Sequence, residues 1–265
     1  MPRAKRRLGQ HFLYDPRILS RIAAATGAGP GDTVLEIGAG PGGLTAALAA
    51  TGARIVAIEK DPELLAPLAA RLPGVILAEG DALDLDWQAI AGSDRVIVAG
   101  NIPYNITSPL IDKALTAPLP VRIVFLVQKE VADRVAAPPG QGSYGALSVG
   151  VQATARVERL FTVPAGAFHP PPKVDSAVLR LTPLDHPLVS TADRAGFRRM
   201  VVALFGFRRK QMLRAVRELT GWSSERAGSA LAASGIAGTA RVEVLSPAEL
   251  TRLHGRLVDG GWCSD

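Results

Sequence analysis

Cysteine is almost absent from this 265-residue sequence, which has one, Cys263. An internal disulfide is therefore excluded, and a reducing compartment is expected. Four scattered histidines and one cysteine do not form the ligand set of a structural zinc site, so no metal is expected. Apolar runs of membrane-spanning length are also lacking, and the basic start is not followed by the apolar stretch of a secretory signal. We therefore expect a soluble, cytoplasmic protein with no membrane contact.

Acidic residues are the minority charge, with 24 Asp and Glu against 30 Lys and Arg, which gives a net charge of +6. This moderate excess permits a polyanionic partner without proving one. Hydrophobic residues make up 48% of the chain and charged residues 20%, an ordinary balance for a globular protein. The length suits one large domain, or a large domain followed by a small one.

A glycine-rich turn follows the first apolar strand. Gly38, Gly40 and Gly43 come directly after the strand-like run 33–37 and have the spacing G-x-G-x-x-G. Glycine is needed where the backbone must approach a ligand without a Cβ in the way. The next strand ends at Glu59, about 20 residues after the turn, where an acid that binds a ribose belongs. The pattern predicts a βαβ unit that binds a nucleotide-type cofactor.

Two cofactor classes share this pattern. A dinucleotide needs backbone amides and a helix dipole for its pyrophosphate, whereas S-adenosylmethionine needs further polar groups at later strand ends. The chain supplies them in Asp81, placed to accept from an adenine amine beside Ala82 or Leu83, and in Asn101. With Glu59 they form a series at the carboxyl edge of a parallel sheet. This series favours S-adenosylmethionine, and an NAD-dependent oxidoreductase is the alternative.

The four residues Asn101, Ile102, Pro103 and Tyr104 end a buried strand. The Asn side-chain oxygen and a main-chain carbonyl next to the proline supply two acceptors for a planar amine, and the tyrosine ring supplies a stacking face. Pro103 fixes its own φ and keeps Ile102 out of helical geometry, which gives the carbonyls a fixed direction. An ordinary strand-to-loop turn uses the same residue types, and this stretch alone does not decide between the two interpretations.

From about residue 184 the pattern changes to helices without strands. Residues 194–217 contain eight basic residues and no acidic one. Lys210, Arg214 and Arg217 share one helical face by their i, i+4, i+7 spacing. A long run of one sign favours contact with phosphates, which indicates a small helical domain that docks on RNA.

The chain contains a series of motifs in this order: Gly9–Leu13, Glu36–Gly40, Glu59, Asp81, Asn101–Tyr104, Gln128–Arg134, Tyr144–Ser148, Phe168–Ser176, Phe207–Leu213 and Arg241–Ser246. Together they cover nearly the whole chain and resemble those of the ribosomal RNA adenine dimethyltransferase family, and the later ones resemble its small-subunit branch. His11 stands where the family commonly has Asn, and an imidazole can also donate or accept a hydrogen bond there.

The resemblance implies an α/β fold, in which a Rossmann-like methyltransferase sheet has helices on both faces and a small all-helical domain follows. Residues 1–183, with a basic N-terminal tail, would form the catalytic domain that binds S-adenosylmethionine, and 184–265 the helical RNA-docking domain. Together with the periodicity, it predicts helices over 18–25, 44–50 and 129–135 and strands over 33–37, 54–58, 75–79, 96–100, 121–127, 147–154 and 176–181.

The resemblance also assigns residues to three sites. The cofactor site would comprise His11, Leu13, Gly38, Gly40, Glu59, Asp81, Ala82 and Asn101. The catalytic site would comprise Asn101, Ile102, Pro103, Tyr104 and Phe168, although Phe168 could equally anchor a proline-stiffened loop in the core. RNA would be bound by Arg208, Arg209, Lys210, Arg214 and Arg217.

The implied reaction is the dimethylation of two adjacent adenosines in a hairpin near the 3′ end of small-subunit rRNA, in an assembling particle, by a monomeric enzyme. Three alternatives stay open. A resistance-type enzyme that modifies large-subunit rRNA shares Asn101–Tyr104, but the three prolines 170–172 and Tyr144-Gly145 disfavour it. An oxidoreductase leaves Asn101–Tyr104 and the basic helices unexplained. A non-catalytic ribosome-assembly module would not need Asn101, Tyr104 and Glu59 intact.

Overall fold

The computed structural model describes residue 5, residues 9–116 and residues 118–263. Apart from Lys5, the basic run from Arg3 to Arg7 therefore lies outside the described residues. The chain forms two compact units, of which the first comprises Met1–Ala132 with Arg156–Pro183 and the second Asp133–Ala155 with Leu184–Asp265. The sequence predicts a single domain boundary near residue 184, which would place Asp133–Ala155 in the sheet domain. In the structure this segment groups with the C-terminal helices instead.

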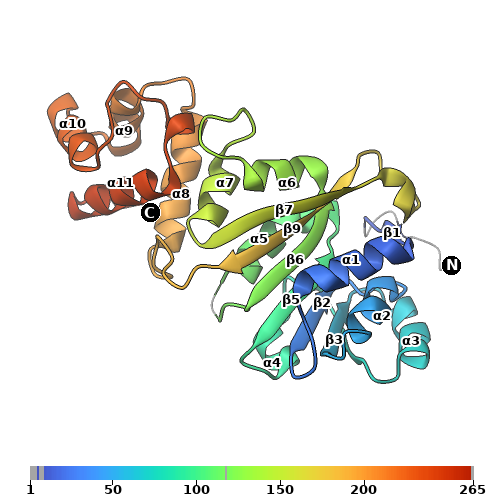
Figure 1. The fold of residues 1–265 in the computed structure, drawn as a ribbon. Coiled ribbons are helices and arrows are strands. Elements are labelled where there is room, and N and C mark those ends of the chain that lie inside the picture. Colours follow the sequence, from blue (N-terminus) through green and yellow to red (C-terminus); the bar gives the residue numbers. More distant parts are fainter. Residues whose placement is uncertain (1–4, 6–8, 117, 264–265) are drawn as a thin grey trace. The chain divides into compact units, whose positions relative to one another are not determined.

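A seven-stranded sheet organises the first unit, in the order β4-β3-β2-β5-β6-β9-β7 (Figure 1). The five strands from β4 to β6 are parallel, and β9 pairs with β6 in the antiparallel direction. The bounds are β2 (Thr33–Ile37), β3 (Arg54–Glu59), β4 (Ile76–Glu79), β5 (Val96–Asn101), β6 (Arg122–Gln128), β7 (Ala155–Val163) and β9 (Ser176–Pro183). The strand order reverses between β2 and β5, which is where open parallel sheets bind ligands.

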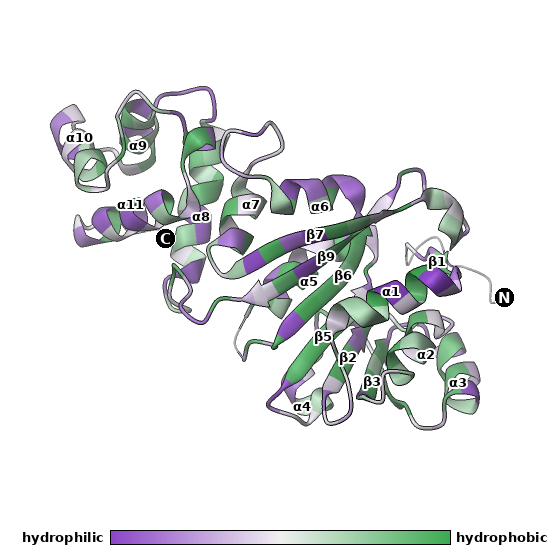
Figure 2. Ribbon diagram, in the orientation of Figure 1, coloured by the Kyte–Doolittle hydropathy of each residue, from purple (hydrophilic) through white to green (hydrophobic). Residues whose placement is uncertain are grey.

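Side chains alternate between two buried faces of this sheet, which is why β5 and β6 are apolar almost without interruption (Figure 2). Val34 and Ile97 face the core that includes Leu19, Ile22, Leu44 and Leu48, from α1 (Pro16–Thr26) and α2 (Gly43–Ala49). Leu35, Val96 and Val98 face Trp87 and Ala114, from α4 (Trp87–Ala91) and α5 (Thr107–Ala114). Helix α3 (Pro62–Arg71) joins β3 to β4. Helices therefore cover both faces, as the sequence predicts.

The strands predicted over 33–37, 54–58, 75–79, 96–100, 121–127 and 176–181 are confirmed, as are helices α1, α2 and α6 (Lys129–Ala136). The strand predicted over 147–154 is wrong, because Ala146–Gln152 forms helix α7. Ser148 accepts a hydrogen bond from the Gly145 amide, which caps the start of α7, and its hydroxyl donates to the Arg134 carbonyl. These local bonds and the helical spacing of the buried Ser148, Val149 and Val151 outweigh the strand preference of the valines. The strand that completes the sheet starts later, at Ala155.

The second unit has its own core, built by α7 and the C-terminal helices. They are α8 (Arg194–Gly206), α9 (Met212–Thr220), α10 (Ser224–Ala233) and α11 (Pro247–Asp259), with a 3-10 turn η4 (Val242–Val244). Buried side chains such as Tyr144, Phe197, Met200 and Leu253 form this core, and the Tyr144 hydroxyl donates to the Leu245 carbonyl at 2.7 Å. Residues 184–263 contain no strand, as the sequence predicts. Within the described part of the chain, no helix is both long and apolar enough to cross a membrane.

Candidate active site

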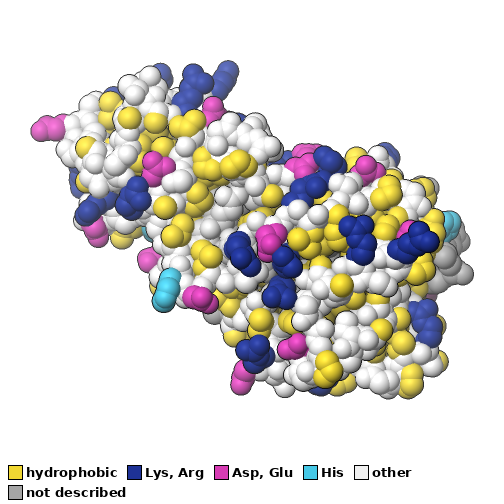
Figure 3. Space-filling model, in the orientation of Figure 1, with side chains coloured by type: hydrophobic (Ala, Val, Ile, Leu, Met, Phe, Trp, Pro, Cys, Tyr) yellow, Lys and Arg dark blue, Asp and Glu magenta, His cyan; other side chains and the backbone are white. Residues whose placement is uncertain are grey.

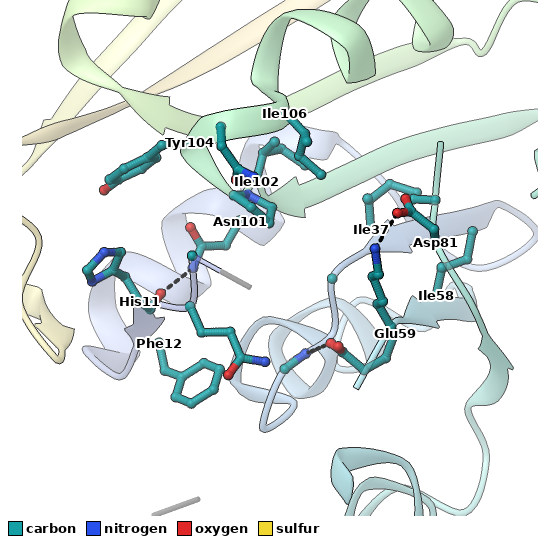
Figure 4. Close-up of a pocket in the computed structure, with 18 of the residues that line it drawn as sticks. His11, Phe12, Ile37, Ile58, Glu59, Asp81, Asn101, Ile102, Tyr104 and Ile106 are labelled. Carbon is teal, nitrogen blue, oxygen red and sulfur yellow. Dashed lines mark hydrogen bonds and ion pairs between the residues drawn. The ribbon is translucent and has the colours of Figure 1, made fainter. Parts of the chain in front are cut away.

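A cavity open to solvent lies at the carboxyl ends of β2, β3, β4 and β5. The turn after each strand contributes to its wall, and the N-terminal segment 9–12 closes one side (Figure 4). Of the predicted cofactor and catalytic residues, ten line it: His11, Gly38, Gly40, Glu59, Asp81, Ala82, Asn101, Ile102, Pro103 and Tyr104. The series of strand ends in the sequence therefore comes together at one place.

The glycine-rich turn is tied to the strand beside it. Gly38 and Gly40 have φ angles of 76° and 55°, which strongly favour glycine. The Gly40 amide donates to Glu59 Oε2 at 2.7 Å, and the Asp61 amide donates to Glu59 Oε1 at 2.8 Å. Burial raises the pKa of Glu59, and these two amides oppose the rise because they stabilise the carboxylate. Glu59 is thus a fixed carboxylate beside a turn that leaves space for a ligand.

Asp81 does not stand open in the cavity. Its Oδ2 accepts from Lys60 Nζ at 2.6 Å and its Oδ1 from the Leu83 amide at 2.9 Å. The hydrogen bond from Lys60 is the main reason that the pKa of Asp81 is lowered. Each carboxylate oxygen can accept a second hydrogen bond, so Asp81 keeps acceptor capacity for a ligand amine. Lys60 lines the cavity, and sequence reasoning missed it because an exposed lysine after a strand carries no motif.

The Asn101 amide has a fixed orientation. Its Nδ2 donates to the main-chain carbonyl of His11 at 2.8 Å. Because that carbonyl only accepts, the Asn101 Oδ1 faces the other way, toward the cavity beside Tyr104 (Figure 4). The Pro103 carbonyl already accepts from the Ile106 amide at 3.2 Å, which makes the Ile102 carbonyl the better second acceptor for an amine. The structure thereby distinguishes between two carbonyls that the sequence treats alike.

Tyr104 is half-buried, and its hydroxyl lies 2.8 Å from Ser176 Oγ. The ring is stacked on the His11 imidazole, with centroids 5.6 Å apart and planes inclined by 22°. His11 Nδ1 lies 2.8 Å from the Pro170 carbonyl. A two-stranded ladder of β1 (Phe12–Leu13) and β8 (Phe168–His169) holds these segments together. This ladder is too short to have a periodic signal in the sequence.

Two predicted site residues lie outside the cavity. Phe168 is 2% exposed and packs in the core with Leu13, Leu19 and Val163. Leu13, a predicted cofactor residue, is 7% exposed and belongs to the same core. The pairing of β1 with β8 directs both side chains inward. In this conformation Phe168 is the core anchor of a proline-stiffened loop and not a stacking surface.

Lys5 forms a contact with the start of α3 that the sequence does not predict. Lys5 Nζ forms ion pairs with Asp61 Oδ1 at 2.7 Å and Glu63 Oε1 at 2.9 Å, and its amide donates to the Gln10 side chain. The hydrogen bond to Asp61 is the main reason that the pKa of Lys5 is raised. Asp61 is also the N-cap of α3, so its contacts with Lys5 and Gln10 link these two residues to the start of that helix. A basic residue near a terminus has no recognisable partner in a sequence.

Glu36 lies in β2 with both carboxyl oxygens buried and unpartnered. Burial raises its pKa from 4.5 to about 8. The folded protein therefore keeps a proton that the unfolded chain releases near pH 4.5, so stability should fall as pH rises from about 5 to about 8. We expect this fall to be on the order of 4 kcal/mol and to be absent in Glu36→Gln. Urea unfolding at several pH values, without cofactor, measures it. Parallel pH profiles of the two proteins would contradict the assignment.

The predicted RNA-binding residues lie in the second unit, around α9. Two of them share one acid, which follows the basic run directly: Lys210 and Arg214 both pair with Glu218, the latter at 2.9 Å. Arg208 pairs with Glu243 at 2.6 Å. Arg209 and Arg217 are exposed. Figure 3 shows basic side chains projecting into solvent in the region of α8 and α9. Lys210 precedes α9, so the prediction that it shares a helical face with Arg214 and Arg217 is wrong, and the acids Glu218 and Glu243 partly neutralise these basic residues.

Comparisons with known proteins agree on one family. The family model "Ribosomal RNA adenine dimethylase" matches residues 1–258. A "Ribosomal RNA small subunit methyltransferase A" from Myxococcus xanthus is 42% identical over 95% of this chain and 90% of its own length. The protein of the same name from Geobacter sulfurreducens is 42% identical over 98% of this chain and 97% of its own length.

Solved structures give the same fold. A dimethyladenosine transferase from Plasmodium falciparum has a TM-score of 0.83 at 25% identity, covering 95% of this chain and 98% of its own. The 23S rRNA methyltransferase ErmE has a TM-score of 0.72 at 30% identity, covering 93% of this chain and 99% of its own. The higher identity to the small-subunit methyltransferases favours that branch over the large-subunit one.

Proposed function

This chain belongs to the ribosomal RNA adenine dimethylase family, and we propose that it transfers methyl groups from S-adenosylmethionine to the exocyclic amine of two adjacent adenosines in a 3′-terminal hairpin of small-subunit rRNA. It is an enzyme that acts on RNA. The fixed Asn101 amide carries the proposal, since its oxygen faces the cavity beside the Tyr104 ring. We further propose that it acts in the cytoplasm, as a monomer, on an assembling small-subunit particle.

The cavity fits the cofactor. It offers a turn of positive-φ glycines and two carboxylates around a space that is open to solvent. In this proposal Glu59 would bind the ribose hydroxyls and Asp81 the adenine amine, with Ala82 against the adenine face. The His11 carbonyl accepts from Asn101, and residues 9–12 would enclose one side of the cavity. When bound, the sulfonium supplies an activated methyl group at the carboxyl edge of the sheet.

The residues around Asn101 would prepare the acceptor. The amine nitrogen of adenine is a poor nucleophile because its lone pair is delocalised into the ring. Asn101 Oδ1 and the Ile102 carbonyl would accept its two hydrogens, which favours a pyramidal nitrogen with its lone pair available. The Ile102 amide donates to the Leu126 carbonyl at 3.0 Å, which fixes this part of the loop. Tyr104 would stack on the base, which has to leave its RNA stack to enter the site.

No general base is required, because the methylated ammonium product can lose its proton to water. Positioning of the amine in line with the methyl group would then supply most of the rate. A second methylation requires that the site accept a monomethylated amine with one remaining hydrogen. One of the two acceptors, Asn101 Oδ1 or the Ile102 carbonyl, would be enough to accept the remaining hydrogen.

Nucleoside analysis tests the proposed function. Mass spectrometry of rRNA from cells with and without the gene should show the loss of dimethyladenosine from the small-subunit rRNA. Loss of dimethyladenosine from the large-subunit rRNA instead would favour the alternative function, a methyltransferase of large-subunit rRNA. A titration with NAD and with S-adenosylmethionine, in which only the second binds, separates the methyltransferase from the oxidoreductase.

The basic residues in and just before α9, and the acid that pairs with two of them, give opposite predictions for RNA binding. Replacing Lys210, Arg214 and Arg217 by Gln should weaken RNA binding and flatten its salt dependence, because fewer phosphate counterions are released. Glu218→Gln should strengthen binding, since Glu218 now pairs with Lys210 and Arg214. Filter binding from 50 to about 200 mM salt measures both. If both salt slopes equal that of the wild type, these residues do not contact phosphate.

A further inference from the structure

Lys113 lies in the last turn of α5 and is half-buried. Its ammonium donates to the Leu83 and Leu85 carbonyls, each at 2.7 Å, and lies 5.5 Å from the centre of the Trp87 ring. Hydrogen bonds from a charged donor are stronger than those between neutral groups, and partial burial strengthens them further. The side chain does not line the cofactor cavity. Lys113 therefore holds main-chain groups from outside that cavity.

The two carbonyls belong to the turn that follows β4. This turn carries two of the predicted cofactor residues, Asp81 and Ala82, and both line the cavity. The Leu83 amide donates to Asp81 Oδ1 at 2.9 Å, and the Leu85 amide donates to the Asp81 main-chain carbonyl at 3.1 Å. Lys113 thus binds the carbonyls of the same two leucines whose amides fix Asp81.

The charge of Lys113 also acts on Asp81. The pKa of this carboxyl is lowered chiefly by the hydrogen bond from Lys60, and the charges of Lys60 and Lys113 lower it further. Lys60 lines the cofactor cavity, whereas Lys113 lines a second cavity together with Trp87. Both lysines favour the ionised carboxylate, which accepts hydrogen bonds and does not donate them.

Helix α5 connects this turn to the acceptor loop. It begins at Thr107, directly after the loop 101–106, and the Thr107 hydroxyl donates to the Pro103 carbonyl at 3.3 Å. Lys113 lies about 9 Å further along the helix axis. One helix is therefore hydrogen-bonded to the acceptor loop at its start and to the turn of Asp81 near its end.

We propose that Lys113 is a positioning residue for the cofactor: it holds the turn after β4 so that the Asp81 carboxylate meets the adenine amine, and through α5 it keeps this turn at a fixed separation from the acceptor loop. This inference deepens the proposed function and rests on it. Lys113 itself contacts neither cofactor nor substrate. Its loss frees the turn, so the carboxylate is less well placed for the amine and the preference for adenine declines.

The preference for adenine is the quantity to measure. Lys113→Met keeps most of the side-chain volume and removes the ammonium. We expect the Kd for S-adenosylhomocysteine to rise about 10-fold or more, as for a lost hydrogen bond to a charged group. S-inosylhomocysteine has an oxygen in place of the adenine amine, so Asp81 accepts no hydrogen bond from that position. Its Kd should change by less than about 3-fold. Calorimetry with both ligands gives the ratio of the two Kd values, which a merely structural role of Lys113 would leave unchanged.

Gln88→Met is the matched control. Gln88 lines the same second cavity as Lys113, but its amide donates to the Ser93 carbonyl and to Asp94 and not to the turn after β4. Neither Kd should change in this variant. Lys113→Gln, whose side chain is one bond shorter and cannot hold both carbonyls, gives the same comparison if Lys113→Met does not fold.

Two outcomes overturn the inference alone: an unchanged ratio of the two Kd values in a folded Lys113 variant that replaces the ammonium, or an equal change of the ratio in Gln88→Met. Wild-type protein that does not bind S-adenosylhomocysteine would overturn the proposed function and, with it, this inference.

Discussion

Asn101→Ala is expected to lower kcat for RNA methylation by about 100-fold or more, while the Kd for S-adenosylmethionine changes by less than about 10-fold. The variant removes one of two acceptors that would grip the target amine, and the loss of one preorganised polar group at a reacting centre costs about this much. The cofactor would keep its other contacts, above all Glu59, which two backbone amides hold in place. Single-turnover kinetics and calorimetry measure the two effects separately.

Asn101→Asp separates the role of the acceptor oxygen of Asn101 from that of its hydrogen bond to the His11 carbonyl. The carboxylate keeps an acceptor oxygen but loses the Nδ2 donor, so it would repel the His11 carbonyl that now receives a hydrogen bond. We expect a rate between those of wild type and Asn101→Ala. If Asn101→Ala is as active as wild type, the side chain has no part in the reaction. If Asn101→Asp is the more impaired of the two, orientation by His11 matters more than the acceptor.

The sequence predicted well what depends on long periodic patterns. The parallel strands and the glycine-rich turn were identifiable because most strand positions are apolar and the turn follows one strand directly. The strand ends Glu59, Asp81 and Asn101 were correctly expected to meet, since carboxyl ends of parallel strands share one edge. The same reasoning failed for Ala146–Gln152, where valines indicated a strand and a capping serine decided for a helix.

Contacts between short segments far apart in the chain were beyond the sequence. The pairing of Phe12–Leu13 with Phe168–His169 involves two residues on each side, too few for any periodicity. That pairing buries Phe168 and, through His11, sets the orientation of Asn101. The ion pair of Lys5 with Asp61 likewise joins residues 56 positions apart. Motifs identified which residues gather at the site, but not which atoms face the ligand.

Gly100→Ala is expected to disrupt both the fold and the site. Gly100 lies in β5 directly before Asn101, beside the point where the strand order reverses. A Cβ at this position would lie 2.5 Å from the Ile37 carbonyl oxygen and 2.9 Å from Ile102 Cδ1. The carbonyl belongs to the backbone of β2 and cannot rotate away as a side chain would, so β2 and β5 have to move apart. We expect a loss of about 3 kcal/mol or more in the free energy of unfolding.

Gly100→Ala should also lower the rate of catalysis at temperatures where the variant stays folded. Moving Asn101 by even about 1 Å relative to Gly38 would misalign the amine and the methyl group, which can cost about 100-fold in rate. Urea unfolding gives the first quantity, and kcat measured well below the unfolding temperature gives the second. Gly74→Ala is the matched control, because no atom lies within 4 Å of its added Cβ. If Gly100→Ala has wild-type stability and rate, β2 and β5 can move apart without consequence. The hypothesis that a rigid strand edge positions Asn101 for the target amine would then be wrong.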